Sequence, residues 1–529
     1  MRHRLALAIF MALLTGALDL HGQAPGAPAV RADGLELTIE GVQAAFRAGT
    51  LTCRELVAGY LARIEAYDKA GPSLNTIQAL NTRALQDADR LDAAFKASGP
   101  VGPLHCVPVL VKDQVDTSDM PTTYGSAVFK GFIPPSDATV VTKLKSAGAV
   151  IVAKTTMGEY ASGYLGSAAG VIRNAYDPTR NASGSSGGTG SGIAANFALV
   201  GIAEDTGGST RGPAAVNNLV GLRPTLPLVS RHGLFPARPS TDTLGPVART
   251  VRDAALLFDA IVGYDPKDPV TAYGVGHVPA TYTASLSLDG LKGARIGVIR
   301  QPMDARADVV SDDYLRVRAV TDRAIAQLKA LGAEIVDPVT VPAVIDLVSR
   351  AYDGNIFETE EAVNAYLADR PHAPVKTLRD ILLSGKVAPA RARTLITSVG
   401  RTRDDPGYAQ VQRLAEQTRQ TILTLMADNK LDALVYATFD QPPARIPHDV
   451  MTRADIDLTG IGNNRRLSPV IGFPALTVPA GFTSDGLPVG LELMARPYAE
   501  PVLFRFAYAY EQATRHRKPP ATVPALQRR

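Results

Sequence analysis

Two stretches rich in glycine and hydroxyl-bearing residues are the places where this chain could do chemistry. The first is SGSSGGTGSG at residues 183–192, and the second is DTGGSTR at residues 205–211. Glycine lets backbone amides approach a ligand and adopt positive φ, while serine and threonine supply hydroxyls. Residues 194–203 between them are apolar enough for a buried helix that runs into a strand. The two stretches therefore predict two walls of one site.

Three other interpretations of residues 183–192 compete with this one. A flexible glycine-serine linker is disfavoured because an apolar run follows at once. The letters GSSGG at 184–188 also fit the G-x-S-x-G nucleophile elbow of an α/β-hydrolase, with Ser186 as nucleophile. His232 or His448 would then complete a Ser-His-Asp set. A phosphate-cradling loop is weaker, since this stretch contains neither G-x-x-x-x-G-K-[ST] nor G-x-G-x-x-G.

A lysine at the end of an apolar run supplies a second feature. Residues 102–113 read GPLHCVPVLVKD, so Lys112 ends a predicted buried strand. An isolated lysine would normally extend its ammonium to water. Burial disfavours the charged form and lowers a lysine pKa, and a neutral lysine can serve as a general base. A buried Lys112 could thus deprotonate a serine without any histidine.

The order and spacing of these motifs resemble those of the amidase signature hydrolases. The resemblance covers most of the chain after about residue 36, and its layout is most similar to exported peptide amidases and aryl acylamidases. The matching segments are 107–113, GSSGG at 184–188, DTGGSTRGPA at 205–214, KTTMGEY at 154–160, VGLRPT at 220–225, DTLGP at 242–246 and GFPALTVP at 472–479.

Position by position, the resemblance implies a Ser-Ser-Lys catalytic triad. Ser209 matches the nucleophile, Ser185 the bridging serine that the family holds in a cis peptide, and Lys112 the base. The implied reaction is hydrolysis of a linear carboxylic amide to a carboxylate and ammonia or an amine, through an acyl-enzyme on Ser209. No cofactor is implied.

The resemblance also assigns roles around the nucleophile. Asp205 and Arg211 match positions that brace the loop, so we interpret them as structural. Thr210 stands where the family usually has isoleucine, and ASG at 182–184 stands where it usually has Pro-Gly-Gly. These departures remove no catalytic group. The implied oxyanion hole consists of the backbone amides of Thr206, Gly207, Gly208 and Ser209.

Substrate contacts and alternative activities are less sharply defined. Tyr124, Ser186 and Tyr160 are candidate substrate contacts, although each tyrosine is weighed against an ordinary packing role. The same serine could also cleave esters or carbamates. A noncatalytic homologue that only binds an amide is the alternative from another class, and the joint presence of the lysine and both serines argues against it. Pocket residues are expected from loops around 124–126, 160–166 and 440–464.

The elements around these motifs alternate between strand and helix. Strands are predicted at 107–112, 149–153 and 199–203, with helices between them, which indicates a mixed central β-sheet covered by helices on both faces. Ligand sites in such sheets lie in loops beyond strand ends. The sequence predicts one amidase signature domain over 37–520, with a helix-rich region near the substrate pocket at 345–429.

Composition narrows the class of partner. Of 529 residues, 46% are apolar and 20% charged, typical of a soluble globular protein. A net charge of +4 with no Lys/Arg block gives no argument for nucleic acid. The eight histidines are scattered, so we expect no metal. The expected ligand is a small-molecule or short peptide amide, and the oligomeric state stays open.

The two ends of the chain carry expectations of their own. Residues 1–24 have a basic start, an apolar core at 5–14 and a GQA cleavage pattern at 22–24, which predicts a signal peptide and a periplasmic or secreted enzyme. An uncleaved anchor is the alternative. No later apolar stretch is long enough to span a membrane. We further expect a disordered mature N-terminus at 25–36 and a loose tail at 521–529.

Cys53 and Cys106 are the only cysteines of the chain. Two cysteines in an exported protein can pair. However, Cys53 lies beside a capping-box pattern, Thr52 to Glu55, that is typical of a surface helix start, whereas Cys106 lies in the apolar run that leads to Lys112. We therefore expect two free thiols.

Overall fold

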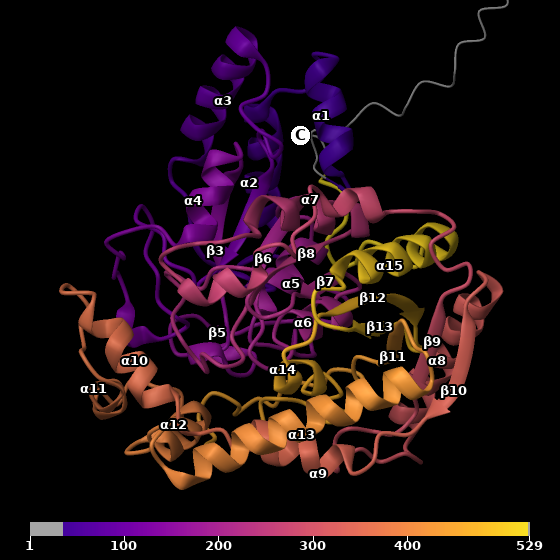
Figure 1. Cartoon of the computed structure of the whole chain (residues 1–529). Coiled ribbons are helices and arrows are strands. Elements are labelled where there is room, and N and C mark those ends of the chain that lie inside the picture. Colours follow the sequence, from indigo (N-terminus) through magenta and orange to yellow (C-terminus); the bar gives the residue numbers. More distant parts are fainter. Residues whose placement is uncertain (1–34, 527–529) are drawn as a thin grey trace, which may run out of the picture.

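An eleven-stranded mixed sheet forms the centre of the protein in the computed structural model, which describes residues 35–526 (Figure 1). The strands are β1 (Ile77–Leu80), β2 (Pro108–Lys112), β3 (Val150–Thr155), β4 (Leu165–Gly166), β5 (Gly170–Val171), β6 (Val200–Glu204), β7 (Val220–Arg223), β8 (Leu244–Ala248), β9 (Arg295–Ile299), β10 (Glu334–Val339), β11 (Ala433–Ala437), β12 (Ala475–Phe482) and β13 (Pro488–Ala495). The sheet has the order β1-β3-β2-β6-β8-β7-β12-β13-β11-β9-β10, and β4 and β5 form a separate antiparallel pair.

Parallel pairing is confined to two parts of this sheet. β2 runs parallel to both β3 and β6, and β9 runs parallel to both β10 and β11. The other neighbours are antiparallel. All five residues of β2 and all six of β3 are buried, as expected for parallel strands covered on both faces.

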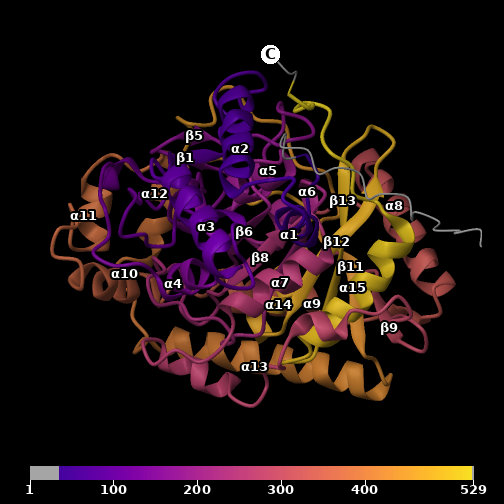
Figure 2. The ribbon, with the colours of Figure 1, turned by 90° about the horizontal axis from the view of Figure 1, so that it is seen from above.

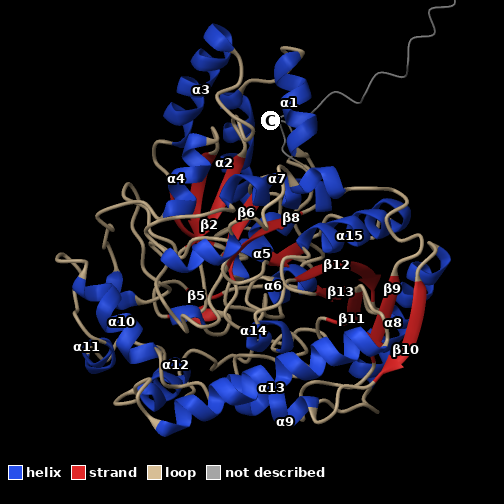
Figure 3. Ribbon diagram, viewed as in Figure 1, coloured by secondary structure: helices blue, strands red, loops and turns tan. Residues whose placement is uncertain are grey.

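Helices surround the sheet (Figure 3). They are α1 (Ile39–Arg47), α2 (Cys53–Tyr67), α3 (Ala84–Ser98), α4 (Thr139–Ser146), α5 (Gly187–Ala194), α6 (Arg211–Val216), α7 (Val251–Ile261), α8 (Asp312–Ala330), α9 (Val344–Val348), α10 (Thr359–Ala368), α11 (Leu378–Leu383), α12 (Pro389–Leu395), α13 (Pro406–Asp428), α14 (Leu467–Ile471) and α15 (Glu500–Thr514). In both Figure 1 and Figure 2, α10–α12 lie at one end of the molecule and α8 with β9 at the other. The predicted fold class, a mixed sheet covered by helices, is confirmed.

A capping motif separates the first two helices. The apolar pattern of residues 38–67 continues across a break, but α1 ends at Arg47 and α2 begins at Cys53. The Thr52 side chain accepts a hydrogen bond from the Glu55 amide, and the Glu55 carboxylate accepts one from the Thr52 amide. This capping box satisfies amides at the helix start, so it fixes where α2 begins.

The prediction of two free thiols is wrong. Cys53 and Cys106 form a disulfide, with their Cα atoms 5.7 Å apart. Cys53 is buried although it lies at a helix start, and Cys106 occupies a left-handed turn with φ of 54° just before β2. The sequence pattern placed Cys53 on the surface because it could not reveal that α2 packs this end inward. The bond links the start of α2 to the start of β2.

Both ends of the described chain are held to the core. Glu36, inside the range predicted to be disordered, forms an ion pair with Arg517 at 2.8 Å. Val523, inside the range predicted to be loose, is buried, and its carbonyl and that of Pro524 accept hydrogen bonds from Arg63. The predicted signal peptide at 1–24 lies outside the described residues.

Among the described helices, none combines the length and apolarity that crossing a bilayer requires.

Candidate active site

Lys112, the last residue of β2, meets a hydroxyl and a carboxylate in a fully buried setting. Its Nζ lies 2.6 Å from Ser185 Oγ and 2.8 Å from Glu204 Oε2. Burial lowers the pKa of Lys112, and the negative charge of Glu204 offsets part of this effect. The end of β2 thus carries an amine whose charged form is disfavoured and which lies within hydrogen-bond distance of Ser185.

Ser185 is presented to this lysine by a tightly packed turn. The Gly184–Ser185 peptide bond is cis, as the resemblance implied. A Cβ on residue 184 would lie 1.7 Å from the carbonyl oxygen of Gly163, so only glycine fits there. The Ser185 carbonyl accepts a hydrogen bond from the Gly158 amide at 2.9 Å. These contacts fix the first glycine loop against the loop that follows β3.

Asp205 organises the second glycine loop from inside. Its carboxylate accepts hydrogen bonds from the amides of Gly208, at 2.7 Å, and Thr210, at 3.2 Å, and it forms an ion pair with Arg211 at 3.1 Å. Burial by itself would raise the pKa of Asp205, but Arg211 and Arg223 outweigh it and hold the pKa well below its usual range. The amides of the loop that carries Ser209 therefore point toward the Asp205 carboxylate, which stays ionised.

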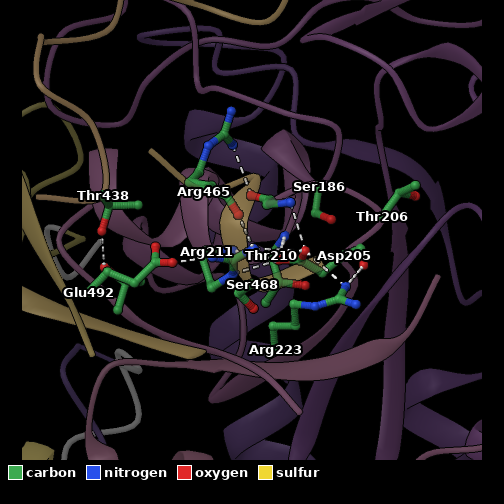
Figure 4. A network of polar contacts seen from close by, with 12 residues as sticks. Ser186, Asp205, Thr206, Thr210, Arg211, Arg223, Thr438, Arg465, Ser468 and Glu492 are labelled. Atoms are coloured by element: carbon green, nitrogen blue, oxygen red, sulfur yellow. Dashed lines mark hydrogen bonds and ion pairs between the residues drawn. The ribbon is translucent and has the colours of Figure 1, made fainter. Parts of the chain in front are cut away.

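Arg211 extends this brace into the sheet. Figure 4 shows its guanidinium between Asp205 and Glu492 of β13, with which it forms a second ion pair. It also donates to the carbonyl of Arg465 at 2.8 Å. The three ionic side chains are fully or almost fully buried, so removing one would leave an uncompensated charge in the interior.

Arg465, which the sequence reasoning did not single out, ties the two glycine loops together. Its Nη1 lies 2.8 Å from the Gly208 carbonyl oxygen and 3.4 Å from that of Gly184. Gly208 has φ of 106°, and a Cβ there would lie 2.3 Å from Cβ of Arg465. The only sequence signal was a pair of arginines, at 465 and 466, directly after the range 440–464 from which pocket residues were expected.

Glu204 is the second residue that sequence reasoning missed. It ends β6, and besides contacting Lys112 its carboxylate contacts the Thr206 hydroxyl, which also lies 2.8 Å from Asp242 Oδ1. Burial raises the pKa of Glu204 to about 7, although Lys112 works against this shift. A run of apolar residues ending in glutamate resembles any strand that reaches the surface, so no local pattern indicated a buried contact.

Ser209 and the backbone around it open onto a cavity of about 720 Å³. Gly184, Thr206 and Gly207 line the same cavity, together with residues from α9, α12 and the loop between β11 and α14. The helix-rich range 345–429 therefore contributes to the walls around the glycine loops. Ser185 and Lys112 lie behind Gly184, out of contact with solvent.

The candidate substrate contacts have different environments. Tyr160 lines the cavity, whereas Tyr124 is buried in an aromatic cluster and lies 3.1 Å from Asp116 Oδ1 through its hydroxyl. Ser186 is buried and donates to the Glu204 carbonyl at 3.1 Å. Neither Tyr124 nor Ser186 lines the cavity.

The histidines of the Ser-His-Asp alternative lie elsewhere. His232 Nδ1 is 3.1 Å from Thr139 Oγ1 at the start of α4, and His448 is exposed. Neither lines the cavity that holds Ser209. Over residues 35–526, no group of three or more His, Cys, Asp or Glu side chains is arranged to hold a metal ion.

Residues 55–504 match the amidase family. The chain belongs to the amidase family. A probable amidase from Arabidopsis thaliana is 32% identical over 513 residues, covering 92% of each chain. One polypeptide of the glutamyl-tRNA(Gln) amidotransferase from Synechococcus sp. (strain JA-2-3B'a(2-13)) is 35% identical, covering 90% of this amidase and 92% of that polypeptide.

Solved structures give the same result. The native peptide amidase from Stenotrophomonas maltophilia is 34% identical, has a TM-score of 0.84, and is covered over 100% of its length by 93% of this amidase. A bacterial aryl acylamidase of the amidase signature family shares the fold, with a TM-score of 0.74 at 23% identity. This member of the amidase signature family is an enzyme that hydrolyses amides.

Proposed function

We propose that this amidase works through an acyl-enzyme on Ser209, with Ser185 and Lys112 moving the proton. The observation that carries the proposal is the 2.6 Å contact between Lys112 Nζ and Ser185 Oγ in a buried setting next to the cavity that Ser209 lines. The Ser186 amide donates to the Ser209 carbonyl at 3.3 Å, which keeps the two loops side by side.

In the proposed reaction, the uncharged amine of Lys112 takes the proton of Ser185 while Ser185 takes that of Ser209. Ser209 Oγ then attacks the amide carbon and forms a tetrahedral intermediate. The proton returns through Ser185 to the amide nitrogen, which leaves as ammonia or an amine and gives an ester on Ser209. Water attacks this ester by the same proton route and releases the carboxylate.

The oxyanion of this intermediate needs donors in the second glycine loop. The Gly208 amide is already engaged by Asp205, so we assign the oxyanion to the amides of Thr206, Gly207 and Ser209. A donor of this kind contributes about 3 kcal/mol to the transition state. Thr206 and Gly207 line the cavity beside Ser209, which supports this assignment.

A test of the nucleophile compares two serines of the same region. Ser209→Ala should abolish turnover and labelling by a serine-reactive fluorophosphonate, detected by intact mass. Ser186→Ala should keep both within a fewfold, because Ser186 does not line the cavity. Normal turnover in the Ser209 variant, or loss of labelling only in the Ser186 variant, would refute the assignment.

We further propose that the substrate is a peptide C-terminal amide or an aryl acylamide. The likeness to the Stenotrophomonas maltophilia peptide amidase over its whole length supports the first, and a cavity of about 720 Å³ accommodates a short peptide. A panel of dipeptide amides, anilides and esters, assayed for ammonia, aniline or alcohol release, ranks these classes. Turnover of esters alone would contradict the proposal.

We also propose that the enzyme is exported. The pattern of residues 1–24 and the disulfide between Cys53 and Cys106 support this, since disulfides persist in oxidising compartments. Cell fractionation combined with N-terminal sequencing of the product tests it. An unprocessed enzyme in the cytoplasmic fraction would contradict it.

A further inference from the structure

The cavity that holds Ser209 is lined by more arginines than carboxylates. Both aspartates of its lining, Asp304 and Asp457, form ion pairs with Arg306, at 2.8 Å for the first. Of the remaining arginines, Arg465 is occupied by the glycine loops. The lining arginines are Arg238, Arg306, Arg391, Arg393, Arg465 and Arg466.

Arg391 is held rigidly without a carboxylate. This α12 residue donates from Nε to the Glu159 carbonyl at 3.0 Å, from Nη2 to the Tyr160 carbonyl at 2.7 Å, and from Nη1 to the Thr394 hydroxyl at 3.0 Å. These three acceptors are neutral. Since a guanidinium has five N–H donors, the group keeps donors and its full charge for another ligand.

Arg238 lines the same cavity as Arg391, and its guanidinium also donates to a backbone carbonyl. Its Nη1 donates to the Tyr352 carbonyl at 2.7 Å, and its guanidinium carbon lies 4.4 Å from the centre of the Tyr352 ring. Burial, and after it the charge of Arg238, lower the pKa of Arg391 to about 10. Two like charges thus act on each other beside the same cavity.

The acidic groups nearest to this pair have other partners. The Glu159 carboxylate accepts hydrogen bonds from the Ser167 hydroxyl and the Ala388 amide. Asp242 accepts the backbone amide of Arg238, not its guanidinium. Within the part of the chain that the structure describes, neither Arg238 nor Arg391 forms a salt bridge with a carboxylate. The charge of Glu159 acts on Arg391 from a distance, but no carboxylate is paired directly with either guanidinium, which leaves both groups able to bind an anionic ligand.

We propose that Arg238 and Arg391 form a subsite for a carboxylate that the substrate carries away from its scissile amide. The proposal rests on hydrolysis at Ser209 in the same cavity, and it narrows the substrate to acidic amides. A planar guanidinium binds a carboxylate through two parallel hydrogen bonds, and two fixed guanidinium groups would orient the substrate as well as attract it. The carboxylate can belong to an acidic side chain of a peptide amide or to a monoamide of a dicarboxylic acid.

Two matched substrate pairs distinguish these sources. The peptide pair is N-acetyl-Glu-Phe amide and N-acetyl-norleucyl-Phe amide, and the small-molecule pair is succinic monoanilide and butyric anilide. A charge-assisted contact in a desolvated site should raise kcat/KM for the acidic member by about tenfold or more. The pair with the larger ratio identifies the source, and higher ionic strength should reduce that ratio.

Variants assign the preference to the two arginines. Arg238→Gln and Arg391→Gln should each reduce the acidic-to-neutral ratio by about tenfold while leaving kcat/KM for the neutral member within about twofold. Arg403→Gln is the matched control, because Arg403 pairs with Glu361 and lies outside the cavity lining. It should leave the ratio unchanged.

The subsite can fail independently of the catalytic assignment. The subsite is refuted if neutral and acidic amides are cleaved equally well and neither arginine variant changes the acidic-to-neutral ratio of kcat/KM. Hydrolysis at Ser209 would still stand. Calorimetric binding of both peptide amides to the Ser209→Ala protein decides the subsite even if turnover is absent. Tighter binding of the acidic peptide, lost on adding Arg238→Gln, is expected; equal binding would overturn the proposal.

Discussion

Two buried lysines on neighbouring strands have nearly the same surroundings and different consequences. Lys112 ends β2 and contacts Ser185 and Glu204. Lys154 of β3 contacts the Thr122 hydroxyl at 2.6 Å and the Asp113 carboxylate at 3.4 Å. Burial lowers the pKa of both lysines. A buried lysine with a perturbed pKa is therefore not enough to identify a base.

The difference lies in what each hydroxyl reaches. Lys112 is paired in register with Thr155, so Lys154, one residue earlier, points to the other face of the sheet. The partner of Lys112, Ser185, directly follows Gly184, and Gly184 lines the substrate cavity. Thr122, in contrast, is buried and absent from the cavity lining. Position relative to the cavity separates the proposed base from a structural ion pair.

The largest effect is expected from Lys112→Met. Without an amine to accept the proton of Ser185, kcat/KM should fall by about a thousandfold or more. Amide hydrolysis and the melting temperature should be measured on the same preparation, so that loss of folded enzyme is not mistaken for loss of chemistry. Retention of more than a tenth of the wild-type rate would remove Lys112 from the mechanism.

Lys154→Met should lower the stability of the protein and leave its activity nearly unchanged. Breaking this pair leaves the Asp113 carboxylate buried without its cation, which costs about 3 to 5 kcal/mol of stability. The midpoint of urea unfolding should fall, whereas activity per folded molecule should stay within a fewfold. If turnover fell as far as in the Lys112 variant, the distinction between the two faces of the sheet would be wrong.

Removing the disulfide tests whether the cross-link before β2 affects the position of Lys112 at the other end of the strand. Cys106 precedes the strand and Lys112 ends it. Replacing both cysteines by serine removes a cross-link that closes a loop of 53 residues, which should lower stability by about 2 to 4 kcal/mol. The kcat at 25 °C should stay unchanged. A marked fall in kcat would mean that the tether sets the position of Lys112.

The smallest predicted effect concerns the carboxylate beside the base. Glu204 raises the pKa of Lys112, so Glu204→Gln should lower that pKa and extend the neutral amine to lower pH. The acid limb of the kcat/KM profile should then move to lower pH. Asp113→Asn, the matched change beside Lys154, should leave the limb in place. An upward shift in the Glu204 variant would contradict the assigned role of the pair.

The sequence specified the parts of this site that lie within motifs. A strand end that carries Lys112 and two glycine loops left local patterns, the resemblance supplied Ser185 and Ser209 within those loops, and the catalytic roles of all three stay predictions. The mixed sheet followed from alternating strands and helices. Glu204 and Arg465 were missed because their roles depend on contacts across the fold. The disulfide was mispredicted for the same reason, since the local cap at Thr52 said nothing about which side of α2 meets β2.

Arg465, which contacts both glycine loops, is translated long after them. Both glycine loops belong to the first half of the chain, but the side chain that spans them arrives more than 250 residues after Gly208. A polypeptide still emerging from the ribosome carries every proposed reacting group and lacks the clamp that fixes their spacing. We therefore expect that a chain terminated before residue 465 does not hydrolyse amides.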